Sequence, residues 1–379
     1  MDVYLRHQMI WRALYDLAHL PLEQLFHATH EDLHVDGPVL LVPNHACAWD
    51  PLLVGLSLRD KQVYFVASEH LFRMGPVSRL IEYLVAPIPR RKATTGTDTV
   101  KACLRHLKAG HSVCLFAEGE QTWDGRNIPI FPATGKLVKS SGATLVTYRL
   151  EGNYLSIPRW GKGIRRGRVH GHPVGIYPPE QLKAMKPKDI NALIERDTAE
   201  DAWERQKQNC VPFRGKNRAV GMERALYLCP RCHRLGTLRT EGNRIFCDCG
   251  LRLDYTEACF FSPAEPFLTL ADWDDWQREQ LRQRAFPHDG ETGLLFSDGG
   301  ITLFRVRAGH KEELLGAGGL QLYEDRLVCA DHCFPLDHIS HMADVLASRL
   351  LLTVDGEYYE IRSKNGVSFR KYLEIWKEH

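Results

Sequence analysis

The chain has 379 residues, more than one ordinary domain holds, so two or three domains are expected. Its hydrophobic share of 44% and charged share of 25% are typical of a globular protein and exclude a disordered tail protein. The 49 basic and 47 acidic residues give a formal net charge of +2, which provides no general attraction to nucleic acid. No nucleic-acid partner is therefore expected, and any attraction to anionic surfaces has to come from local patches.

The cysteines and the N-terminal residues bear on the compartment. The 11 cysteines are scattered and odd in number, and the first residues contain no apolar core of a signal peptide. This pattern predicts a protein of the reducing cytoplasm whose cysteines are buried or bind metal. No apolar run approaches the ~18 residues that a membrane-spanning helix requires. We therefore expect a chain that does not span a bilayer but can still lie on one.

The first predicted domain comprises residues 1–225. Residues 1–30 are expected to form helix, interrupted at Pro21, with Trp11, Tyr15 and Phe26 available for contact with a membrane. From about residue 37 to 179, short apolar runs alternate with helical stretches, which predicts an α/β domain with a mixed sheet flanked by helices. The polar stretch up to residue 225 is expected to be a helical connector.

The most informative segment of this domain is PVLLVPNHACAWDPLLVGL, in which an apolar strand leads into a helix. Asn44 and His45 follow the carboxyl end of the strand, where open α/β sheets carry their active sites. Asp50 precedes Pro51 and is expected at the helix N-cap. Its carboxylate can also reach the imidazole, hold one ring nitrogen and leave the other as a general base. The alternative is an ordinary cap beside an exposed loop histidine.

Two further segments add candidate residues for an anionic ligand. An apolar strand ends at Phe116 and is followed by Glu118 and Gly119, and a glycine at this point lets backbone amides approach an anion. Arg90 and Arg91 follow a short extended segment, and guanidinium groups are good partners of phosphate. Taken alone, the two arginines also fit a solvated surface turn.

In this order, the segments resemble the glycerolipid acyltransferases, the family of 1-acylglycerol-3-phosphate acyltransferases. The family's first block, Asn-His, four residues, Asp, is matched from Asn44 to Asp50, and its arginine block by Arg90 or Arg91. The block Phe-Pro-Glu-Gly-Thr-Arg-Ser corresponds to FAEGEQT at residues 116–122, and the fourth block at most to GATLVTYRLEG. The resemblance covers roughly residues 30–180.

The resemblance implies an O-acyltransferase (EC 2.3.1.-) of phospholipid biosynthesis. The acyl chain would pass from acyl-CoA or acyl-carrier protein to a hydroxyl of a lysolipid, 1-acylglycerol-3-phosphate or a related lysophospholipid. His45 would be the general base and Asp50 would hold it. Such an enzyme would be peripheral on the cytoplasmic face of a membrane. Substrate binding is then assigned to Asn44, Arg90, Arg91, Glu118 and Gly119.

The chain departs from the family pattern in the third block. Gln121 stands where the family has arginine, and Glu120 stands where threonine is usual. A cation is lost and an anion gained beside the expected phosphate, so lysophosphatidic acid is not expected to be an exclusive acceptor. Lys136, Lys139 and Arg149 are candidates to compensate.

A cationic segment at residues 159–168, with Trp160, adds a second candidate for membrane contact. Its alternatives are a solvated turn or a contact with nucleic acid.

The second predicted domain, residues 226–260, carries four cysteines. Cys229 and Cys232 are separated from Cys247 and Cys249 by a hairpin's length of chain, which predicts a zinc ribbon with a structural Zn²⁺. The second pair is Cys-x-Cys instead of the usual Cys-x-x-Cys, so His233 or Cys259 could replace a ligand. Such ribbons often bind nucleic acid or protein, and buried free cysteines are the remaining alternative.

The third predicted domain, residues 261–379, is β-rich. Strands separated by Gly or Asp turns are expected from about residue 293 to 363, followed by a closing helix, a pattern that resembles pleckstrin-homology or GRAM domains. This segment supports the rival hypothesis of an inactive acyltransferase-like lipid-binding or zinc-ribbon regulatory adaptor. The sequence leaves the oligomeric state open.

Overall fold

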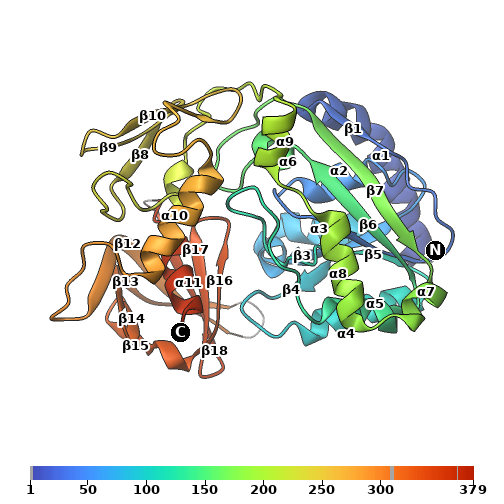
Figure 1. The fold of residues 1–379 in the computed structure, drawn as a ribbon. Coiled ribbons are helices and arrows are strands. Elements are labelled where there is room, and N and C mark those ends of the chain that lie inside the picture. The colour runs from blue at the N-terminus through green and yellow to red at the C-terminus, as the bar shows by residue number, and fades with distance from the viewer. Residues whose placement is uncertain (1–2, 308–310, 365) are drawn as a thin grey trace. The chain divides into compact units, whose positions relative to one another are not determined.

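The computed structural model describes residues 3–307, 311–364 and 366–379, which form two compact units (Figure 1). Each unit is built from three segments of the chain. Unit 1 comprises Met1–Arg91, Gly96–Arg159 and Ile164–Gly215. Unit 2 comprises Lys92–Thr95, Trp160–Gly163 and Lys216–His379. Three segments from the sequence range of the predicted first domain therefore belong to unit 2: Lys92–Thr95, Trp160–Gly163 and residues 216–225.

Unit 1 is built on a seven-stranded mixed sheet, which confirms the α/β prediction. Its strand order is β1-β7-β6-β2-β5-β3-β4, and all neighbours are parallel except β6 and β7. The strands are β1 (Ala28–His30), β2 (Val39–Pro43), β3 (Val63–Ser68), β4 (Ile88–Arg90), β5 (Ser112–Cys114), β6 (Thr144–Glu151) and β7 (Val169–Tyr177).

Helices cover both faces of this sheet because its central strand is apolar on both sides. In β2, Val39 and Leu41 pack with residues of α1 (Val3–Phe26) and α2 (Asp50–Gly55). The alternate residues Leu40 and Val42 pack in a separate cluster with the other helices, and Figure 1 shows α8 in front of the sheet. These other helices are α4 (Thr97–Lys108), α5 (Thr134–Ser141) and α8 (Pro187–Thr198). Unit 1 also contains α3 (Pro76–Val85), α6 (Asn153–Ser156), α7 (Pro179–Ala184) and α9 (Ala202–Gln208).

Pro21 lies inside α1 and does not interrupt it, contrary to the prediction from the sequence. A proline removes the hydrogen bond to the carbonyl four residues earlier. That residue, Leu17, is 75% exposed, so water can replace the missing donor. The helix ends at Phe26, and the residues from Ala28 form strand β1 instead of more helix.

Unit 2 contains two antiparallel sheets. The four-stranded sheet has the order β11-β10-β9-β8, and the seven-stranded sheet has the order β15-β14-β13-β12-β18-β17-β16. The first is formed by β8 (Leu238–Glu241), β9 (Arg244–Cys247), β10 (Arg252–Tyr255) and β11 (Phe261–Ser262). The second is formed by β12 (Leu294–Val306), β13 (Glu312–Tyr323), β14 (Arg326–Cys329), β15 (His332–Pro335), β16 (Ile339–Val345), β17 (Arg349–Val354) and β18 (Glu357–Ser363).

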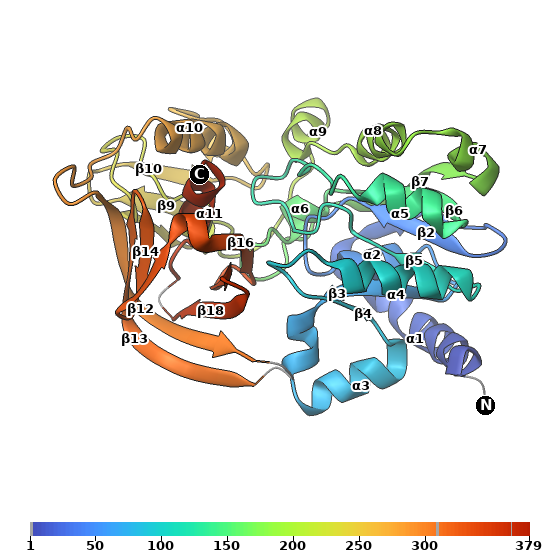
Figure 2. The same ribbon diagram turned by 90° about the horizontal axis from the view of Figure 1, so that it is seen from below.

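Two helices complete unit 2 and lie side by side (Figures 1 and 2). A capping box of Thr269 and Asp272 starts α10 (Leu270–Arg282). The buried guanidinium of Arg370, on α11 (Arg370–Lys377), donates to both carboxylate oxygens of Asp274 on α10 at 2.6 Å. The predicted strands and closing helix are thus present, while the resemblance to pleckstrin-homology or GRAM domains stays a prediction.

The segment Lys92–Thr95 is held by strands of the seven-stranded antiparallel sheet of unit 2. Ala93 belongs to a buried apolar cluster with Val306, Ala343, Val345, Leu351 and Tyr358. The hydroxyl of Thr353 donates to the carbonyl of Ala93 at 2.7 Å, and the ammonium group of Lys92 donates to the carbonyl of Asp344 at 3.2 Å. Lys92–Thr95 is therefore an integral part of unit 2.

Candidate active site

The loop after β2 folds around the carboxylate of Asp50. Its Oδ2 accepts hydrogen bonds from His45 Nδ1 at 2.8 Å and from the backbone N–H groups of Ala46 at 2.6 Å and Cys47 at 2.9 Å. One carboxylate oxygen thus fixes both the loop backbone and the imidazole. Because Nδ1 faces a carboxylate, the proton of the neutral ring lies on Nδ1 and Nε2 has a lone pair.

Asp50 is not the N-cap of α2, so this part of the prediction is wrong. Trp49 occupies the cap position without a side-chain hydrogen bond, and Asp50 is the first helical residue. The carboxylate points back to the preceding loop because three donors converge there. The structure therefore excludes the interpretation of Asp50 as an ordinary helix cap.

The second oxygen of Asp50 also has partners. Its Oδ1 accepts from the thiol of Cys47 at 3.0 Å and from Asn153 Nδ2 at 2.8 Å. Burial of the carboxyl group would raise the pKa of Asp50, but the hydrogen bond and charge of His45 together with the hydrogen bonds from the thiol and N–H of Cys47 outweigh it and hold this pKa below its usual value. Asp50 is therefore an ionised, fully buried hydrogen-bond acceptor.

The imidazole of His45 is held in place and partly accessible. Its ring stacks on Phe116 with centroids 4.2 Å apart, and its side chain is 15% exposed. Within the part of the chain that the structure describes, no residue hydrogen-bonds to Nε2. This nitrogen can accept a proton from a bound hydroxyl group.

Two residues assigned to substrate binding, Asn44 and Glu118, hold the backbone around His45. Asn44 Nδ2 donates to the carbonyl of Leu150 on β6 at 2.9 Å, and Asn44 Oδ1 accepts from the N–H of Leu150 at 2.7 Å. Glu118 accepts from the N–H of His45 at 3.0 Å, from the N–H of Ile128 at 2.8 Å and from Asn127 Nδ2 at 2.9 Å. Both side chains therefore act on the loop that carries His45.

Glu118 is almost fully buried, and this predicts a measurable pH effect. Burial raises the pKa of Glu118 from 4.5 to about 7, against the opposing effect of its three donors. Between these two pH values the folded protein keeps a proton that the unfolded chain releases, so the free energy of unfolding falls as the pH rises. The Glu118→Gln variant lacks this titration, so its stability relative to the wild type should improve by up to about 3 kcal/mol from pH 4.5 to 7.5.

Urea unfolding of both proteins across this pH range measures the effect. The exposed Glu195 supplies the control, since Glu195→Gln removes a carboxylate without removing a buried titration. Parallel stability curves for Glu118→Gln and the wild type would contradict the prediction.

Gly119 and Arg90 both lie close to the ring of Phe131. Gly119 has φ +72°, and a Cβ atom there would lie 2.2 Å from the Phe131 ring, so only glycine fits. The guanidinium of Arg90 lies 5.6 Å from the centroid of the same ring, within the range of a cation–π contact. The ring is 47% exposed. Arg90, Phe131 and Gly119 thus form one partly exposed surface next to Glu118.

Arg91 is directed to a different group. Its Nε lies 3.7 Å from Glu69 Oε2, and the buried Glu69 also binds Arg73 at 2.7 Å. Of the two arginines left open by the sequence, Arg90 is the one that shares a surface with Gly119.

A pocket adjoins His45 and is lined by residues of α6 and α9 among others. Three of its residues, Arg126, Asn127 and Asn153, were missed by the sequence analysis because they belong to no recognised block. The pocket is lined by Asn44, His45, Ala46, Glu118, Thr122, Gly125, Arg126, Asn127, Gly152, Asn153, Tyr154, Glu200 and Ala202.

Two of the proposed compensating cations, Lys139 and Arg149, do not line this pocket. They donate instead to the backbone carbonyls of Met185 and Asp197.

Arg159 lies beside the unusual third block. Its guanidinium donates to the carbonyl of Gln121 at 2.8 Å, lies 4.1 Å from the centroid of the Trp123 ring and is 3.9 Å from Glu120 Oε2. The negative charge of Glu120 is therefore offset by a nearby cation, which the sequence did not indicate.

Of the aromatic residues predicted to contact a membrane, Phe26 and Trp160 are fully buried. Trp11 and Tyr15 are partly buried and donate to the backbone carbonyls of Leu58 and Leu56. A group of exposed apolar side chains lies instead on α1, on α3 and at Met74 just before α3, and the two helices are in contact. We call this set the apolar face: Val3, Leu5, Met9, Met74, Val77, Leu80 and Tyr83, each between 48% and 64% exposed.

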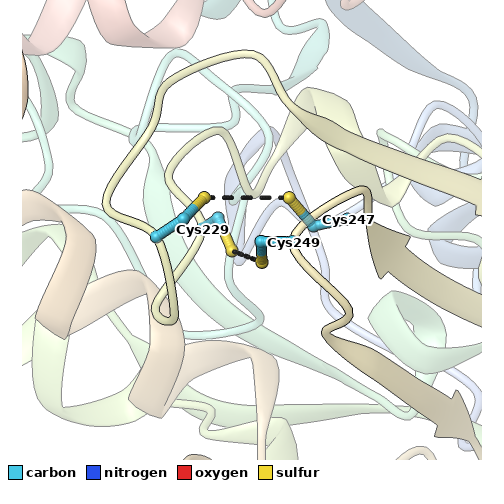
Figure 3. Close-up of side chains that lie close together, drawn as sticks. Cys229, Cys247 and Cys249 are labelled. Carbon is cyan, nitrogen blue, oxygen red and sulfur yellow. Dashed lines mark hydrogen bonds between the residues drawn. The ribbon is translucent and has the colours of Figure 1, made fainter.

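The four predicted cysteine ligands form a compact cluster in unit 2 (Figure 3). The sulfur atoms of Cys229 and Cys249 are 3.6 Å apart, those of Cys232 and Cys247 are 3.8 Å apart, and all four lie within 4.8 Å of one another. Thiolates at ~2.3 Å from a tetrahedral zinc ion are separated by ~3.8 Å, whereas disulfide sulfurs are ~2.05 Å apart. The cluster therefore fits a tetrahedral metal ion.

The alternative ligands are not needed. His233 packs edge-on against Trp276, with ring centroids 5.4 Å apart, and Cys259 lies outside the cluster of four thiols. The Cys-x-Cys pair closes the site by itself because both Cys247 and Cys249 turn toward the first pair (Figure 3).

A model of the acyltransferase family matches residues 25–151. Two curated relatives are chloroplastic 1-acyl-sn-glycerol-3-phosphate acyltransferases, BAT2 of Brassica napus and LPAT1 of Arabidopsis thaliana, 27% and 28% identical over 130 residues. These matches cover 34% of this chain and only 37% and 36% of the relatives. Among solved structures, the 1-acyl-sn-glycerophosphate acyltransferase PlsC from Thermotoga maritima is 18% identical, with a TM-score of 0.38 over 48% of this chain and 79% of PlsC.

Proposed function

Because residues 25–151 carry an acyltransferase-family domain, we propose that this chain transfers an acyl group from acyl-CoA or acyl-carrier protein to a hydroxyl of a lysolipid. The observation that carries the proposal is the His45–Asp50 pair at the carboxyl end of β2, with Nε2 turned away from the carboxylate. The residue types and the geometry are those of a general base held in one tautomer.

The reaction needs one proton to move twice. His45 Nε2 takes the proton of the acceptor hydroxyl as its oxygen attacks the thioester carbonyl carbon. The tetrahedral intermediate then collapses, the carbon–sulfur bond breaks, and the departing thiolate takes the proton from the imidazolium. Asp50 stays ionised and stabilises the positive charge that His45 carries between the two transfers.

We assign the acceptor head group to the surface formed by Arg90, Phe131 and Gly119. The relatives' names specify 1-acyl-sn-glycerol-3-phosphate, and a guanidinium on this surface can bind the phosphate of such a lysophospholipid. Because Gln121 provides no second cation, we expect several lysophospholipids to be accepted.

A panel of lysophospholipids tests both proposals. Thiol release from acyl-CoA should require a lysolipid, and mass spectrometry should find the acylated product for lysophosphatidic acid and at least one other head group. The Arg90→Ala variant should raise the KM for the acceptor about 10-fold or more, since a hydrogen bond to a charged group is lost. Arg91→Ala is the matched control and should leave this KM within about twofold, because Arg91 faces Glu69.

Three outcomes would contradict these expectations. Thiol release without any lysolipid, or none at all, would overturn the acyltransferase proposal, and in the second case a non-enzymatic lipid-binding adaptor would be favoured. Exclusive use of lysophosphatidic acid would point to a further phosphate-binding cation. Equal effects of the two arginine variants would remove Arg90 from the head-group site.

We further propose that the apolar face of α1 and α3 lies on a membrane, which supplies the amphiphilic acceptor. Among the described residues, no helix has both the length and the apolarity needed to cross a bilayer. On the apolar face, Arg6 lies 4.5 Å above the ring of Tyr83, a cation beside an aromatic ring as found at membrane interfaces.

Binding to vesicles of anionic phospholipids measures this contact. Replacing Val77 and Leu80 by glutamate should lower the fraction of protein that sediments with the vesicles by about 10-fold or more, because two charges would enter the interface. Ile176, which is 49% exposed on β7, supplies the control variant Ile176→Glu. Equal sedimentation of the double variant and the control would exclude the apolar face as the membrane contact.

The cysteine cluster is proposed to hold one structural Zn²⁺. Cys229, Cys232, Cys247 and Cys249 would supply four thiolates, a closed shell without a position for water or substrate. The ion would stabilise the hairpin of β8 and β9 and take no part in acyl transfer.

A further inference from the structure

We propose that Asn153 is a positioning residue for the catalytic pair, which holds Asp50 and, through it, the ring of His45. The proposal rests on the proposed acyl transfer for its kinetic consequence, while the contact itself is independent of the substrate. Asn153 lies 103 residues after Asp50 in the chain and outside the segments that resemble the acyltransferase blocks around His45 and Glu118.

The contact is direct and buried. Asn153 Nδ2 donates to Asp50 Oδ1 at 2.8 Å, on the carboxylate oxygen opposite the one that binds His45. Asn153 is 1% exposed and Asp50 is fully buried. The only other described donor to Oδ1 is the thiol of Cys47, which is a weak donor. Asn153 is therefore the stronger of the two groups that fix the rotation of the carboxylate.

The chemistry of the two groups determines the orientation of the amide. An ionised carboxylate can only accept hydrogen bonds, so the NH₂ group of Asn153 must face it. The carbonyl oxygen of the same amide then lies buried without a hydrogen-bond partner among the described residues, at the pocket beside His45. A buried carbonyl without a partner is unfavourable, whereas the hydrogen bond that the NH₂ group donates to the ionised Asp50 is favourable.

The backbone brings Asn153 to this point by a glycine turn. Gly152 has φ +74°, and a Cβ atom there would lie 2.2 Å from the carbonyl oxygen of Arg168. The turn ends β6 and starts α6, so Asn153 enters the site from the strand next to β2. Asn153 is thus the third residue of a hydrogen-bonded series, in which its amide binds the carboxylate of Asp50 and this carboxylate binds the imidazole of His45.

Enzyme kinetics give the first test. Asn153→Ala should lower kcat by about 10-fold while the KM values change less than about twofold, because the base is misplaced and substrate contacts remain. The matched control is Asn191→Ala, which removes a different asparagine. Asn191 accepts from the N–H of Gly135 and donates to the carbonyl of Pro132. This variant should leave kcat unchanged. A kcat for Asn153→Ala equal to that of the wild type would overturn the proposal.

The NMR signals of His45 give a second test that needs no activity. Asn153→Asp has nearly the same shape as the wild type but replaces the amide donor by a second carboxyl group. Two buried carboxyl groups in contact share one proton, which changes the carboxylate that binds His45, so NMR of histidine-labelled full-length protein should show the ring signals of His45 displaced from their wild-type positions. The His45→Ala spectrum assigns the signal. Glu118 and the thiols of Cys47 and Cys114 also face this pair, and they are identical in all variants.

The two tests separate the two proposals. If no lysolipid is acylated but the His45 ring signals are displaced in Asn153→Asp and not in Asn191→Ala, the acyltransferase proposal fails and the positioning contact stands. If these signals are the same in the wild type and in Asn153→Asp, the positioning role is wrong whatever the activity.

Discussion

Replacing His45 by alanine is expected to abolish measurable acyl transfer and to leave the fold intact. The general base contributes about 10²–10⁴-fold to such reactions, and no other described imidazole lines the pocket. The fold should persist because the hydrogen bond from residue 45 to Glu118 uses the backbone N–H, which alanine retains. Steady-state kinetics with acyl-CoA and lysolipid give the loss, and a thermal melt gives the stability.

His172→Ala is the matched control for this variant. His172 Nε2 also lies near a carboxylate, at 3.2 Å from Glu151 Oε1, but the residue is on β7 and does not line the pocket. Its removal should leave kcat unchanged. If His45→Ala retained most of the activity with an unchanged melt, the proposed mechanism would be wrong.

Asp50 is a less suitable target for substitution than His45. Five donors converge on its two oxygens, so the amide nitrogen of Asp50→Asn would face N–H groups or the thiol in either orientation. A buried donor facing donors is destabilising, so this variant changes stability together with activity. The alanine variant of His45 therefore tests the chemistry more directly.

Loss of the proposed zinc ion is expected to unfold residues 226–255 locally. In zinc-finger peptides the binding of a structural zinc ion supplies about 10–16 kcal/mol, and this binding energy is folding energy. Elemental analysis of the purified chain should find one zinc per chain. Cys229→Ser should lose the ion, and hydrogen exchange should become fast in residues 226–255 while β2 and β6 stay protected.

Cys333 provides the control for the zinc prediction. It is exposed and lies outside the cluster, so Cys333→Ser should keep the ion and the exchange pattern of the wild type. Absence of zinc from the wild type, or full zinc content in Cys229→Ser, would overturn the ligand assignment.

Local patterns predicted the elements of unit 1 because each pattern reports on one stretch of chain. The continuous apolar run of β2 predicted a strand buried on both faces, and its two faces do pack in separate clusters. The spacing of His45 and Asp50 predicted a contact that a five-residue loop can close by itself. The cysteine pairs likewise predicted a cluster, since a hairpin brings its two ends together.

The sequence by itself determined the segments that resemble the acyltransferase blocks, the contact between His45 and Asp50, and the cluster of four thiols, because these residues are neighbours along the chain or match a recognised spacing. Only the tertiary structure decided that the Asp50 carboxylate turns away from α2, that Asn153 holds it, and that Arg90, unlike Arg91, shares a surface with Gly119. It also decided that Lys92–Thr95 packs with strands more than 200 residues later. The physical reason is the same in each case. Which donor reaches a buried carboxylate, or which strand covers an alanine, depends on packing between distant segments, and no local pattern of residues records that packing.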